Sequence, residues 1–381
     1  MPTSRGVPRV SPRTTVVGAR VPMRVRGHGG TWCGRDEPQV DRTNPAPEET
    51  WTRSEARSYP RVVASASLEP DTRIGVDLGG TKVEAVVVRT AADGSYEELD
   101  RMRVPTPREQ GYEAVLETVA LLVLRMAART RVPFEALPIG VGMPGGVRRD
   151  GCVKNSNTTC LNGRPFRQDL EARLGRKLVF DNDANCFALA EARFGAGAPW
   201  RSGVVFGVIL GTGVGGGIVC DGRVWRGPQG IAGEWGHHVV WSGTPETPGA
   251  PRACYCGKRG CVESYVCGPA VEADYHRRSG KALDMQGIVA SAGSDPHANA
   301  ALELFLETLA RGLANVINVI DPSAIVLGGG LSNIDRIYQE GPSRVARYVF
   351  NEHLGTPIVR NRLGDSAGVI GAALLTMHER R

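Results

Sequence analysis

The sequence predicts an α/β protein whose two domains face each other across an active-site cleft. Two apolar strand pairs, at 73–88 and 204–220, are each joined by a glycine-rich turn. Such a repeated strand–turn–strand unit indicates a duplicated domain, with one nucleotide held between the two copies. Apolar residues at helical spacing in 112–129 and 296–320 provide helices that can cover the sheets.

The composition fits a chain with a large buried core. The 381 residues are 41% hydrophobic, and at roughly 100–200 residues per domain this length suits two domains. The formal net charge is +6, but the arginines are spread along the chain and do not form one stripe, so nucleic acid is not an expected partner. No stretch approaches the ~18 apolar residues of a membrane helix, and no membrane association is expected. Nine cysteines without disulfide-like spacing indicate a reducing, cytoplasmic location.

Residues 1–72 differ from the rest in composition. Pro, Arg, Gly, Ser and Thr dominate, and apolar pieces such as Val21–Val25 are too short to form a buried face. We expect a disordered extension here, with an anchoring arm, a targeting segment or a start codon placed too far upstream as open alternatives. The domains are expected at 73–180 and 181–365, and a last helix at 366–381 is expected to return to the first domain.

The first glycine turn predicts a phosphate site. Asp77 lies at the end of the first strand, and the turn that follows is Gly79-Gly80-Thr81-Lys82. Glycine permits positive φ and lets a ligand approach the backbone closely. Asp77 beside the turn would hold Mg²⁺ through water, since hard cations prefer oxygen ligands. A plain structural hairpin is the alternative.

The second glycine turn, 211–217, repeats this design. Its glycines match a G-x-G-x-x-G pattern, but a nicotinamide dinucleotide site needs a helix after the glycines, and here a strand and the Asp221-Gly222 turn follow. We therefore expect Gly211, Thr212 and Gly213 to bind phosphate. The later strand 325–330 ends in glycines that leave room for a flat adenine or ribose.

The candidate catalytic base follows the strand 178–180. Asp181, Asp183 and Asn185 lie between that strand and the helix expected at 186–194. A carboxylate beside the amides of a helix N-terminus is a common position for a base, but the three side chains could equally cap the helix. On the residues alone both interpretations stay open. The polar loop 154–158 is suited to hydrogen-bonding a polyol.

The segment 233–263 predicts a metal site. Three cysteines and a histidine in a glycine-rich loop form a Cys₃His set, which tetrahedral zinc accepts. The expected ligands of this closed structural zinc site are His237, Cys254, Cys256 and Cys261. By fixing the loop, the metal would also place Glu234 and Glu263, whose carboxylates could hold sugar hydroxyls. The alternative is a set of reduced, solvent-facing thiols in a floppy loop.

Together these motifs resemble the ROK family of sugar kinases. The resemblance runs from residue 73 to the C-terminus and includes the three-cysteine loop. Its other motifs are Asp77–Lys82, Asn182–Asn185, Gly211–Gly217 and Gly233–His237. Within the family, the loop 154–163 and the cysteine loop are most similar to bacterial fructokinase, also described as manno(fructo)kinase.

The resemblance implies an actin-like, ribonuclease H-like two-domain ATPase fold and phosphorylation of a hexose by ATP. It implies zinc at the four ligands and Asp183 as general base. The implied sugar contacts are Gly145, Asn157, Asn182, Glu234, His237 and Glu263. The implied ATP contacts are Asp77, Gly79, Gly80, Thr81, Lys82, Gly211, Thr212, Gly213, Gly328 and Gly329, with magnesium at Asp77.

Fructose is the expected sugar, because the polar loop 154–162 offers no evident small apolar pocket for an N-acetyl group. An N-acetylglucosamine kinase or a glucokinase of the same family is the alternative. The rival class is a sugar-responsive transcriptional repressor, since the family includes such proteins. Those carry a helix-turn-helix domain ahead of the core, and residues 1–72 show no helical periodicity for one. The expected partners are a hexose, ATP and a second copy of the chain.

Overall fold

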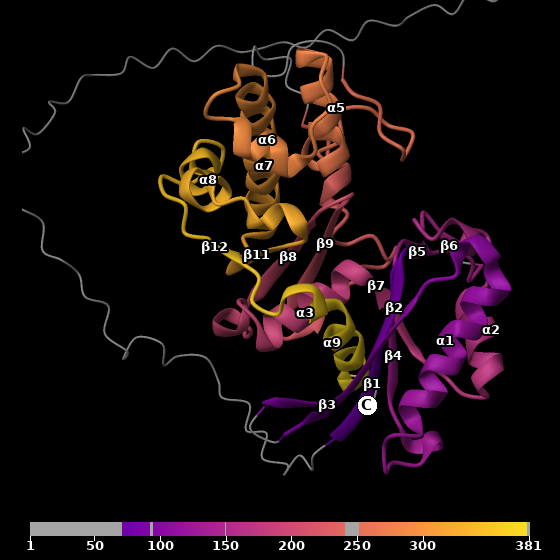
Figure 1. Ribbon diagram of the computed structural model, residues 1–381. Helices are drawn as coiled ribbons and strands as arrows, with labels where there is room; N and C mark the ends of the chain where they lie inside the picture. Colours follow the sequence, from indigo (N-terminus) through magenta and orange to yellow (C-terminus); the bar gives the residue numbers. More distant parts are fainter. Residues whose placement is uncertain (1–70, 92–93, 149, 241–250, 379–381) are drawn as a thin grey trace, which may run out of the picture. The chain divides into compact units, whose positions relative to one another are not determined.

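The computed structural model describes residues 71–91, 94–148, 150–240 and 251–378 (Figure 1). Mixed β-sheets and helices build this part of the chain, which confirms the predicted α/β class. Apart from its last two residues, the predicted extension 1–72 lies outside the described residues. All of the described residues belong to one compact unit.

The first sheet has the strand order β3-β2-β1-β4-β7. Its strands are β1 (Asp71–Leu78), β2 (Lys82–Thr90), β3 (Tyr96–Pro105), β4 (Ile139–Met143) and β7 (Val179–Asn182). The first three strands are antiparallel, whereas β4 and β7 continue the sheet parallel to β1. The hairpin predicted at 73–88 is therefore confirmed, and its turn lies between β1 and β2.

The second sheet repeats this arrangement with the order β10-β9-β8-β11-β12. Its strands are β8 (Val204–Leu210), β9 (Val214–Cys220), β10 (Arg223–Val224), β11 (Ala324–Gly328) and β12 (Ile358–Arg360). Again three antiparallel strands precede two parallel ones. The same succession in both sheets supports the duplication inferred from the two glycine turns. Strand β9 follows the second glycine turn. A nicotinamide dinucleotide site would need a helix there, so this agrees with the expectation that the turn is not such a site.

Helices cover each sheet through an apolar face. α1 (Tyr112–Ala127) packs on β1 and β2 with α2 (Phe166–Leu174) beside it, and short strands β5 (Gly146–Val147) and β6 (Val153–Lys154) follow β4. Around the second sheet, the apolar core includes residues of α4 (Glu263–Val266), α5 (Gly268–Ser279), α6 (Met285–Ser291), α7 (Pro296–Ile320) and α8 (Arg336–Ala346). Within the described ranges, no helix combines the length and apolarity needed to cross a membrane.

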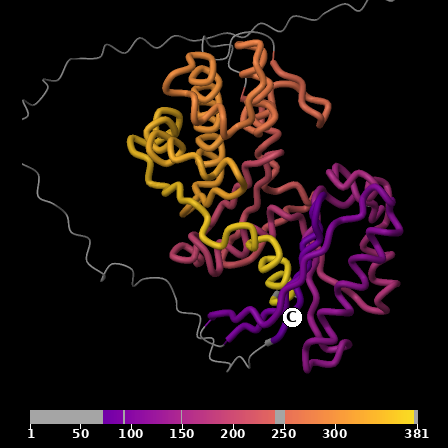
Figure 2. Tube along the Cα trace, viewed as in Figure 1, coloured from indigo at the N-terminus to yellow at the C-terminus, as the bar shows by residue number. Residues whose placement is uncertain are grey.

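Two helices connect the sheets. α3 (Asp183–Phe194) follows β7 of the first sheet but packs on β8 and β9 of the second. α9 (Ala367–Leu375) follows the second sheet but packs on β1 and β4 of the first, and it lies beside these strands in Figures 1 and 2. The two helices also contact each other and share one apolar cluster.

The structure shifts two predicted boundaries. α3 begins at Asp183 rather than at residue 186, and its cap is Asn182, whose side chain accepts a hydrogen bond from the Ala184 N–H. The strand expected at 325–330 ends at Gly328, and a short 3₁₀ helix occupies 330–333. At the start of α3, the Asn182 side chain bonds a backbone N–H that has no partner within the helix. After β11, Gly329 adopts a positive φ, which ends the extended strand.

The crossing of α3 and α9 predicts an unequal response to two alanine substitutions. A methyl group at Gly371 of α9 would overlap the carbonyl oxygen of Cys186 in α3, whereas one at Gly341 of α8 would find its nearest neighbour, Ile337, 4.0 Å away. Gly371→Ala should therefore lower the free energy of unfolding by about 2–3 kcal/mol. Gly341→Ala should leave it unchanged or raise it by up to about 1 kcal/mol, because alanine favours helix. Urea denaturation measures both, and equal stabilities would contradict this packing.

Candidate active site

A cavity of about 880 Å³ lies where the carboxyl ends of strands from both sheets meet. Its volume falls in the range of roughly 300–1,000 Å³ that is usual for ligand sites. The first sheet contributes residues that follow β4 and β7, and the second contributes the turn between β8 and β9. The cavity therefore joins both halves of the duplicated fold.

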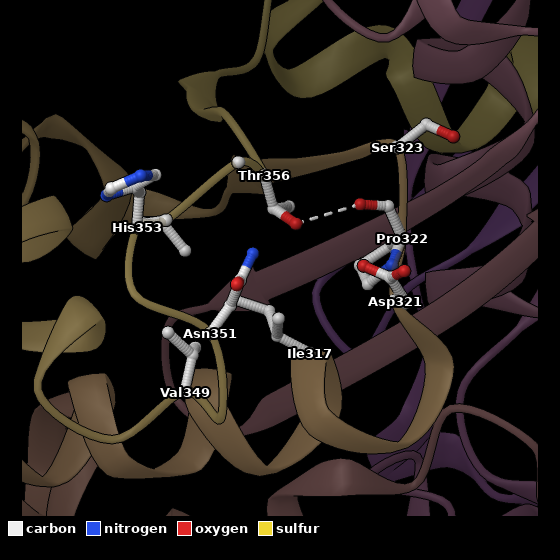
Figure 3. A pocket seen from close by; sticks show the side chains of 10 residues that line it. Ile317, Asp321, Pro322, Ser323, Val349, Asn351, His353 and Thr356 are labelled. Carbon is white, nitrogen blue, oxygen red and sulfur yellow. Dashed lines mark hydrogen bonds between the residues drawn. The ribbon is translucent and has the colours of Figure 1, made fainter. Parts of the chain in front are cut away.

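A smaller cavity of about 350 Å³ lies at the opposite end of β11, near the C-terminus of α7. Thr356 and Pro322 lie on its wall, where the Thr356 hydroxyl donates to the Pro322 carbonyl over 3.0 Å (Figure 3). None of the catalytic or binding residues predicted from the sequence lines this cavity. The larger cavity is therefore the candidate active site.

The larger cavity brings together most of the predicted site residues. All of the expected sugar contacts line it, together with Asp183 and the second glycine turn: Gly145, Asn157, Asn182, Asp183, Gly211, Thr212, Gly213, Glu234, His237 and Glu263. The other expected ATP contacts are not among its lining residues: Asp77, Gly79, Gly80, Thr81, Lys82, Gly328 and Gly329. Residues far apart in sequence that were predicted to contact the sugar thus converge on one cavity, while the first predicted phosphate turn is not part of its wall.

Asp183 is the one carboxylate of the Asp181–Asn185 segment that lines the cavity. Burial raises the pKa of Asp183 to about 6, and the charge of Glu234 adds to this, while a hydrogen bond from the Ala184 N–H acts in the opposite direction. A carboxyl group with a pKa just below neutral can accept a proton and release it again near neutral pH. Its environment therefore suits a general base.

Asp181 and Asn185, the two other candidates for base or helix cap, form hydrogen bonds within the protein. One oxygen of Asp181 accepts from the Asn185 amide over 2.7 Å, and the other accepts from Arg226 Nε over 2.6 Å. Asn182 caps α3 and donates to the Gly145 carbonyl over 2.9 Å. These bonds fix the chain on both sides of Asp183, so its carboxyl group is held at the cavity wall.

Two further carboxylates line the part of the cavity formed by the second half. Glu263 accepts from the Val214 N–H over 2.9 Å, so it is fixed against the strand after the glycine turn. Glu234 precedes the 3₁₀ turn η5 (Trp235–His237), and its Oε2 lies 3.9 Å from His237 Nε2. The hydroxyl of Tyr255 also lies 3.2 Å from that nitrogen. This wall offers several acceptors and one imidazole to a polyol.

The Cys₃His residues fit a tetrahedral metal. Their ligand atoms all lie within 4.8 Å of one another, with 3.6 Å from Cys254 Sγ to His237 Nδ1 and 3.7 Å between the sulfurs of Cys256 and Cys261. A tetrahedron of thiolates around zinc has S···S edges of about 3.8 Å, given Zn–S bonds of about 2.3 Å. The donor atoms therefore converge as a metal site requires. The Nδ1 atom of His237 faces the thiols and its Nε2 atom faces the cavity side.

The glycines of β9 have a packing role. A Cβ on Gly215 or Gly217 would lie 3.0 and 2.7 Å from atoms of Ala184 in α3, and one on Gly216 would lie 2.6 Å from the Gly233 carbonyl oxygen. Since alternate strand residues face opposite sides, α3 lies on one face of β9 and the 233–237 turn on the other. These contacts place Asp183 and Glu234 on walls of the same cavity.

The predicted nucleotide glycines in β11 also have packing neighbours. A Cβ on Gly328 would overlap the ring of Phe187, and one on Gly329 would overlap the Leu210 carbonyl, with Gly329 at a φ of 79°. The close approach expected for adenine or ribose is thus made here by neighbouring protein atoms.

The first phosphate turn is held by its own strands. The Gly79 N–H donates to the Lys82 carbonyl over 2.9 Å, and Lys82 Nζ lies 3.6 Å from the buried Glu84 carboxylate on the same strand. Asp77 packs beneath the start of α9, at Gly368. Burial raises the pKa of Asp77 to about 7, helped by the charges of Asp183 and Glu84. A cation near Asp77 would relieve this repulsion, so the residues fit Mg²⁺ held through water.

Several residues of the site were missed in the sequence. Asn162 closes the polar loop, since its side chain accepts from the Ser156 N–H and donates to the Ser156 carbonyl, each over 2.9 Å. Ile231 lines the cavity and is 48% exposed. Arg226 and Ile231 lie in an irregular loop without periodicity, and only the folded chain brings them to Asp181 and the cavity. Asn162 lies at the end of the polar loop 154–162, but the sequence analysis gave it no role of its own.

Comparisons with known proteins agree with this architecture. A sequence model of the ROK family matches residues 73–379. N-acetyl-D-glucosamine kinase of Vibrio cholerae is 39% identical over 321 residues, covering 80% of this chain and 99% of that protein. The enzyme of the same name from Pasteurella multocida is 38% identical over 310 residues, covering 80% and 98%.

Solved structures show the same fold. The ROK hexokinase from Thermus thermophilus superimposes with a TM-score of 0.69 at 34% identity, covering 81% of this chain and 98% of that one. A ROK family glucokinase from Streptomyces griseus, in complex with glucose and AMPPNP, gives 0.63 at 28% identity, covering 80% and 99%. These neighbours confirm the expected actin-like fold.

The raised pKa of Asp183 predicts a pH-dependent gain in stability for Asp183→Asn. The folded protein binds this proton more tightly than the unfolded chain, because the pKa rises from 3.8 to about 6. The stabilisation by the protonated group is present at low pH and lost as the pH rises through about 6. The variant should therefore melt at a higher temperature than the wild type at about pH 8, with a smaller difference at about pH 5.

Thermal melts at both pH values test this effect. Asp150→Asn is the matched control, because Asp150 is exposed and its pKa is lowered by the Cys152 N–H and by Arg148. It should give no gain at the higher pH. A gain for Asp183→Asn that is the same at both pH values would contradict the pKa assignment.

Proposed function

The chain belongs to the ROK family, and we propose that it is an N-acetylglucosamine kinase. It is an ATP-dependent sugar kinase, since its relatives at 38–39% identity over nearly their whole length are named sugar kinases. The structural observation that carries the proposal is one cavity that holds Asp183, the polar sugar contacts and the glycine turn 211–213. The division into domains at 73–180 and 181–365 remains our proposal.

The choice of sugar departs from the fructose expected from the sequence. The related kinases from Vibrio cholerae and Pasteurella multocida support the alternative, N-acetylglucosamine, and none of the relatives compared supports fructose. The polar loop 154–162 had suggested that no apolar surface was present for an acetyl group. Apolar side chains from other segments, namely Ile209, Val214 and Ile231, are among the residues that line the cavity.

The proposed reaction transfers the γ-phosphoryl group of ATP to a sugar hydroxyl. The hydroxyl oxygen attacks the γ-phosphorus, the bond to the β–γ bridging oxygen breaks, and the hydroxyl proton passes to the Asp183 carboxylate. ADP leaves with the electron pair of the broken bond. Asn157, Asn182, Glu234, His237 and Glu263 would orient the sugar, and positioning accounts for much of the rate enhancement in such transfers.

The second glycine turn would hold phosphate through its backbone amides, and Asp77 would hold Mg²⁺ through water. When bound, the metal would neutralise charge on the phosphates. The first turn, Gly79–Lys82, keeps its proposed role in ATP binding, as do Gly328 and Gly329. Asp183 is the proposed base, and the sugar contacts are likewise proposed.

We also propose that His237 and the three cysteines bind zinc. The convergence of the four donor atoms within 4.8 Å supports this. The metal would hold the 233–263 segment, and with it Glu234 and Glu263, at the cavity. A homodimer and a cytoplasmic location stay predictions from the sequence.

The function predicts both a substrate preference and the effect of Asp183→Asn. In an assay of ADP release, N-acetylglucosamine should give a higher kcat/KM than glucose, mannose or fructose. Asp183→Asn should lower kcat by ~10²-fold or more with the sugar still bound, because the amide cannot accept the proton. Asp150→Asn, at an exposed carboxylate, is the control and should keep wild-type rates.

Other results would change the proposal in definite ways. A preference for fructose would restore the first substrate expectation. If the protein binds a sugar but forms no ADP from ATP with any of the four sugars, the result would favour the sugar-responsive repressor. Near-normal turnover in Asp183→Asn would remove Asp183 from the mechanism.

The zinc proposal predicts metal content and a matched pair of variants. The purified protein should hold about one zinc per chain, and Cys256→Ser should lose both zinc and thermal stability, because a structural metal contributes folding energy. Cys152→Ser changes a free cysteine outside the cluster and should keep both. Elemental analysis and melting curves measure this. A wild-type protein that is metal-free and still fully stable would exclude a structural zinc.

A further inference from the structure

The β1–β2 phosphate turn is braced by the segment that follows β3. The Thr106 hydroxyl donates to the Gly79 carbonyl over 2.8 Å, and the Thr106 N–H donates to the Thr81 carbonyl over 2.9 Å. The Arg108 N–H then bonds to the Thr106 carbonyl over 2.9 Å, at the start of the 3₁₀ turn η1 (Arg108–Gln110). The backbone of Arg108 is thereby fixed relative to the turn.

The Arg108 side chain reaches the open face of this turn. A Cβ built on Gly80 would lie 3.9 Å from Arg108 Nη1 and 3.5 Å from Asn157 Oδ1. Asn157 lines the large cavity, so Arg108 lies next to a wall residue. The Nε atom of Arg108 donates to the exposed Glu109 over 3.1 Å, while Nη1 is the guanidinium nitrogen nearest to Gly80. The Arg108 side chain as a whole is about half exposed, so a ligand can reach it.

The lysine of the turn is directed elsewhere. Lys82 lies on β2, and its ammonium pairs with the buried Glu84 carboxylate, which Arg101 and Arg103 also contact. The turn and the candidate base instead carry Asp77 and Asp183, two carboxylates whose charges repel a polyphosphate. A positive charge next to the transferred phosphoryl group would offset this repulsion together with the proposed Mg²⁺, and Arg108 is placed to provide it.

We propose that Arg108 is a further catalytic residue, which contacts the phosphoryl group being transferred at the Gly80 turn. The inference rests on the proposed kinase function and adds a residue to it. As the bond to the leaving ADP breaks, charge spreads over the phosphoryl oxygens, and a planar guanidinium can bond two of them at once. Arginine keeps its own protons throughout, so the sugar proton still goes to Asp183.

The test compares Arg108→Gln with Arg129→Gln. Both arginines are about half exposed and each pairs with one acidic residue, Glu109 for Arg108 and Asp100 for Arg129. Arg108→Gln should lower kcat/KM for ATP by about 10²-fold, the usual cost of removing one charge-stabilising donor. The KM for the sugar and the melting temperature should stay near the wild-type values. Arg129→Gln should have neither effect.

Two further variants separate charge from structure. Arg108→Lys keeps the positive charge but cannot form bidentate hydrogen bonds, so it should retain part of the activity that Arg108→Gln loses. Guanidinium ion added to Arg108→Gln should restore activity, and the same addition to Arg129→Gln should not raise it. Glu109→Gln removes the carboxylate that pairs with Arg108 and should not reduce the rate.

The outcomes are distinguishable from a failure of the proposed function. Each variant is assayed with whichever sugar supports the fastest ADP release by the wild type, so a wrong substrate assignment leaves the comparison intact. If no sugar supports release, binding of a non-hydrolysable ATP analogue is measured by calorimetry, and Arg108→Gln should weaken it relative to Arg129→Gln. Equal behaviour of the two variants, or a loss confined to sugar affinity, would overturn the role of Arg108.

Discussion

The close approach of backbone on both faces of β9 is the constraint on which the site depends. Gly215 and Gly217 admit α3 on one face, and Gly216 admits the turn before Glu234 on the other. A side chain at these positions would push one layer outward, because a Cβ on Gly216 or Gly217 would meet backbone atoms and one on Gly215 would meet the Ala184 Cβ, none of which can rotate away. Asp183 at the start of α3 and Glu234 would then move apart. The spacing of Asp183 and Glu234 thus depends on the packing at three glycines of β9.

The same arrangement concentrates negative charge. Burial and the neighbouring carboxylates raise the pKa of Asp77 to about 7 and that of Asp183 to about 6. A raised pKa means that the ionised form costs free energy of folding near neutral pH. Carboxylates with shifted pKa values are common at functional sites, and interactions elsewhere in the fold must offset their free energy cost. Here α3 and α9, packed against each other and against both sheets, supply apolar burial around these groups.

The features that the sequence revealed are mostly local. The two hairpins, the helices near 112–127 and 296–320 and the Cys₃His set all follow from spacing within short segments. The boundary of α3 was missed because Asp181, Asp183 and Asn185 were considered as caps, whereas the structure shows that Asn182 caps the helix. Arg226, Ile231 and Arg108 act through contacts that the tertiary fold creates, so no local pattern identified them.

Glycine was the hardest residue to interpret. A glycine run after a strand suggests a ligand in every case, yet the run 211–217 divides into two parts in the structure. Gly211 and Gly213 line the cavity, whereas Gly217, like Gly328 and Gly329, makes room for neighbouring protein atoms. Close approach to a phosphate and close approach to a helix impose the same requirement on the backbone. The sequence alone therefore cannot assign each glycine to one of them.

His237 joins the proposed metal site to the proposed sugar site through its two ring nitrogens. Nδ1 lies 3.6 Å from the Cys254 sulfur, while Nε2 lies 3.2 Å from the Tyr255 hydroxyl and 3.9 Å from Glu234. With a metal on Nδ1, the neutral ring carries its proton on Nε2. That nitrogen then becomes a fixed donor toward the cavity, beside a carboxylate that only accepts. A metal in the loop would therefore set the donor pattern that the sugar meets, in addition to holding the loop in place.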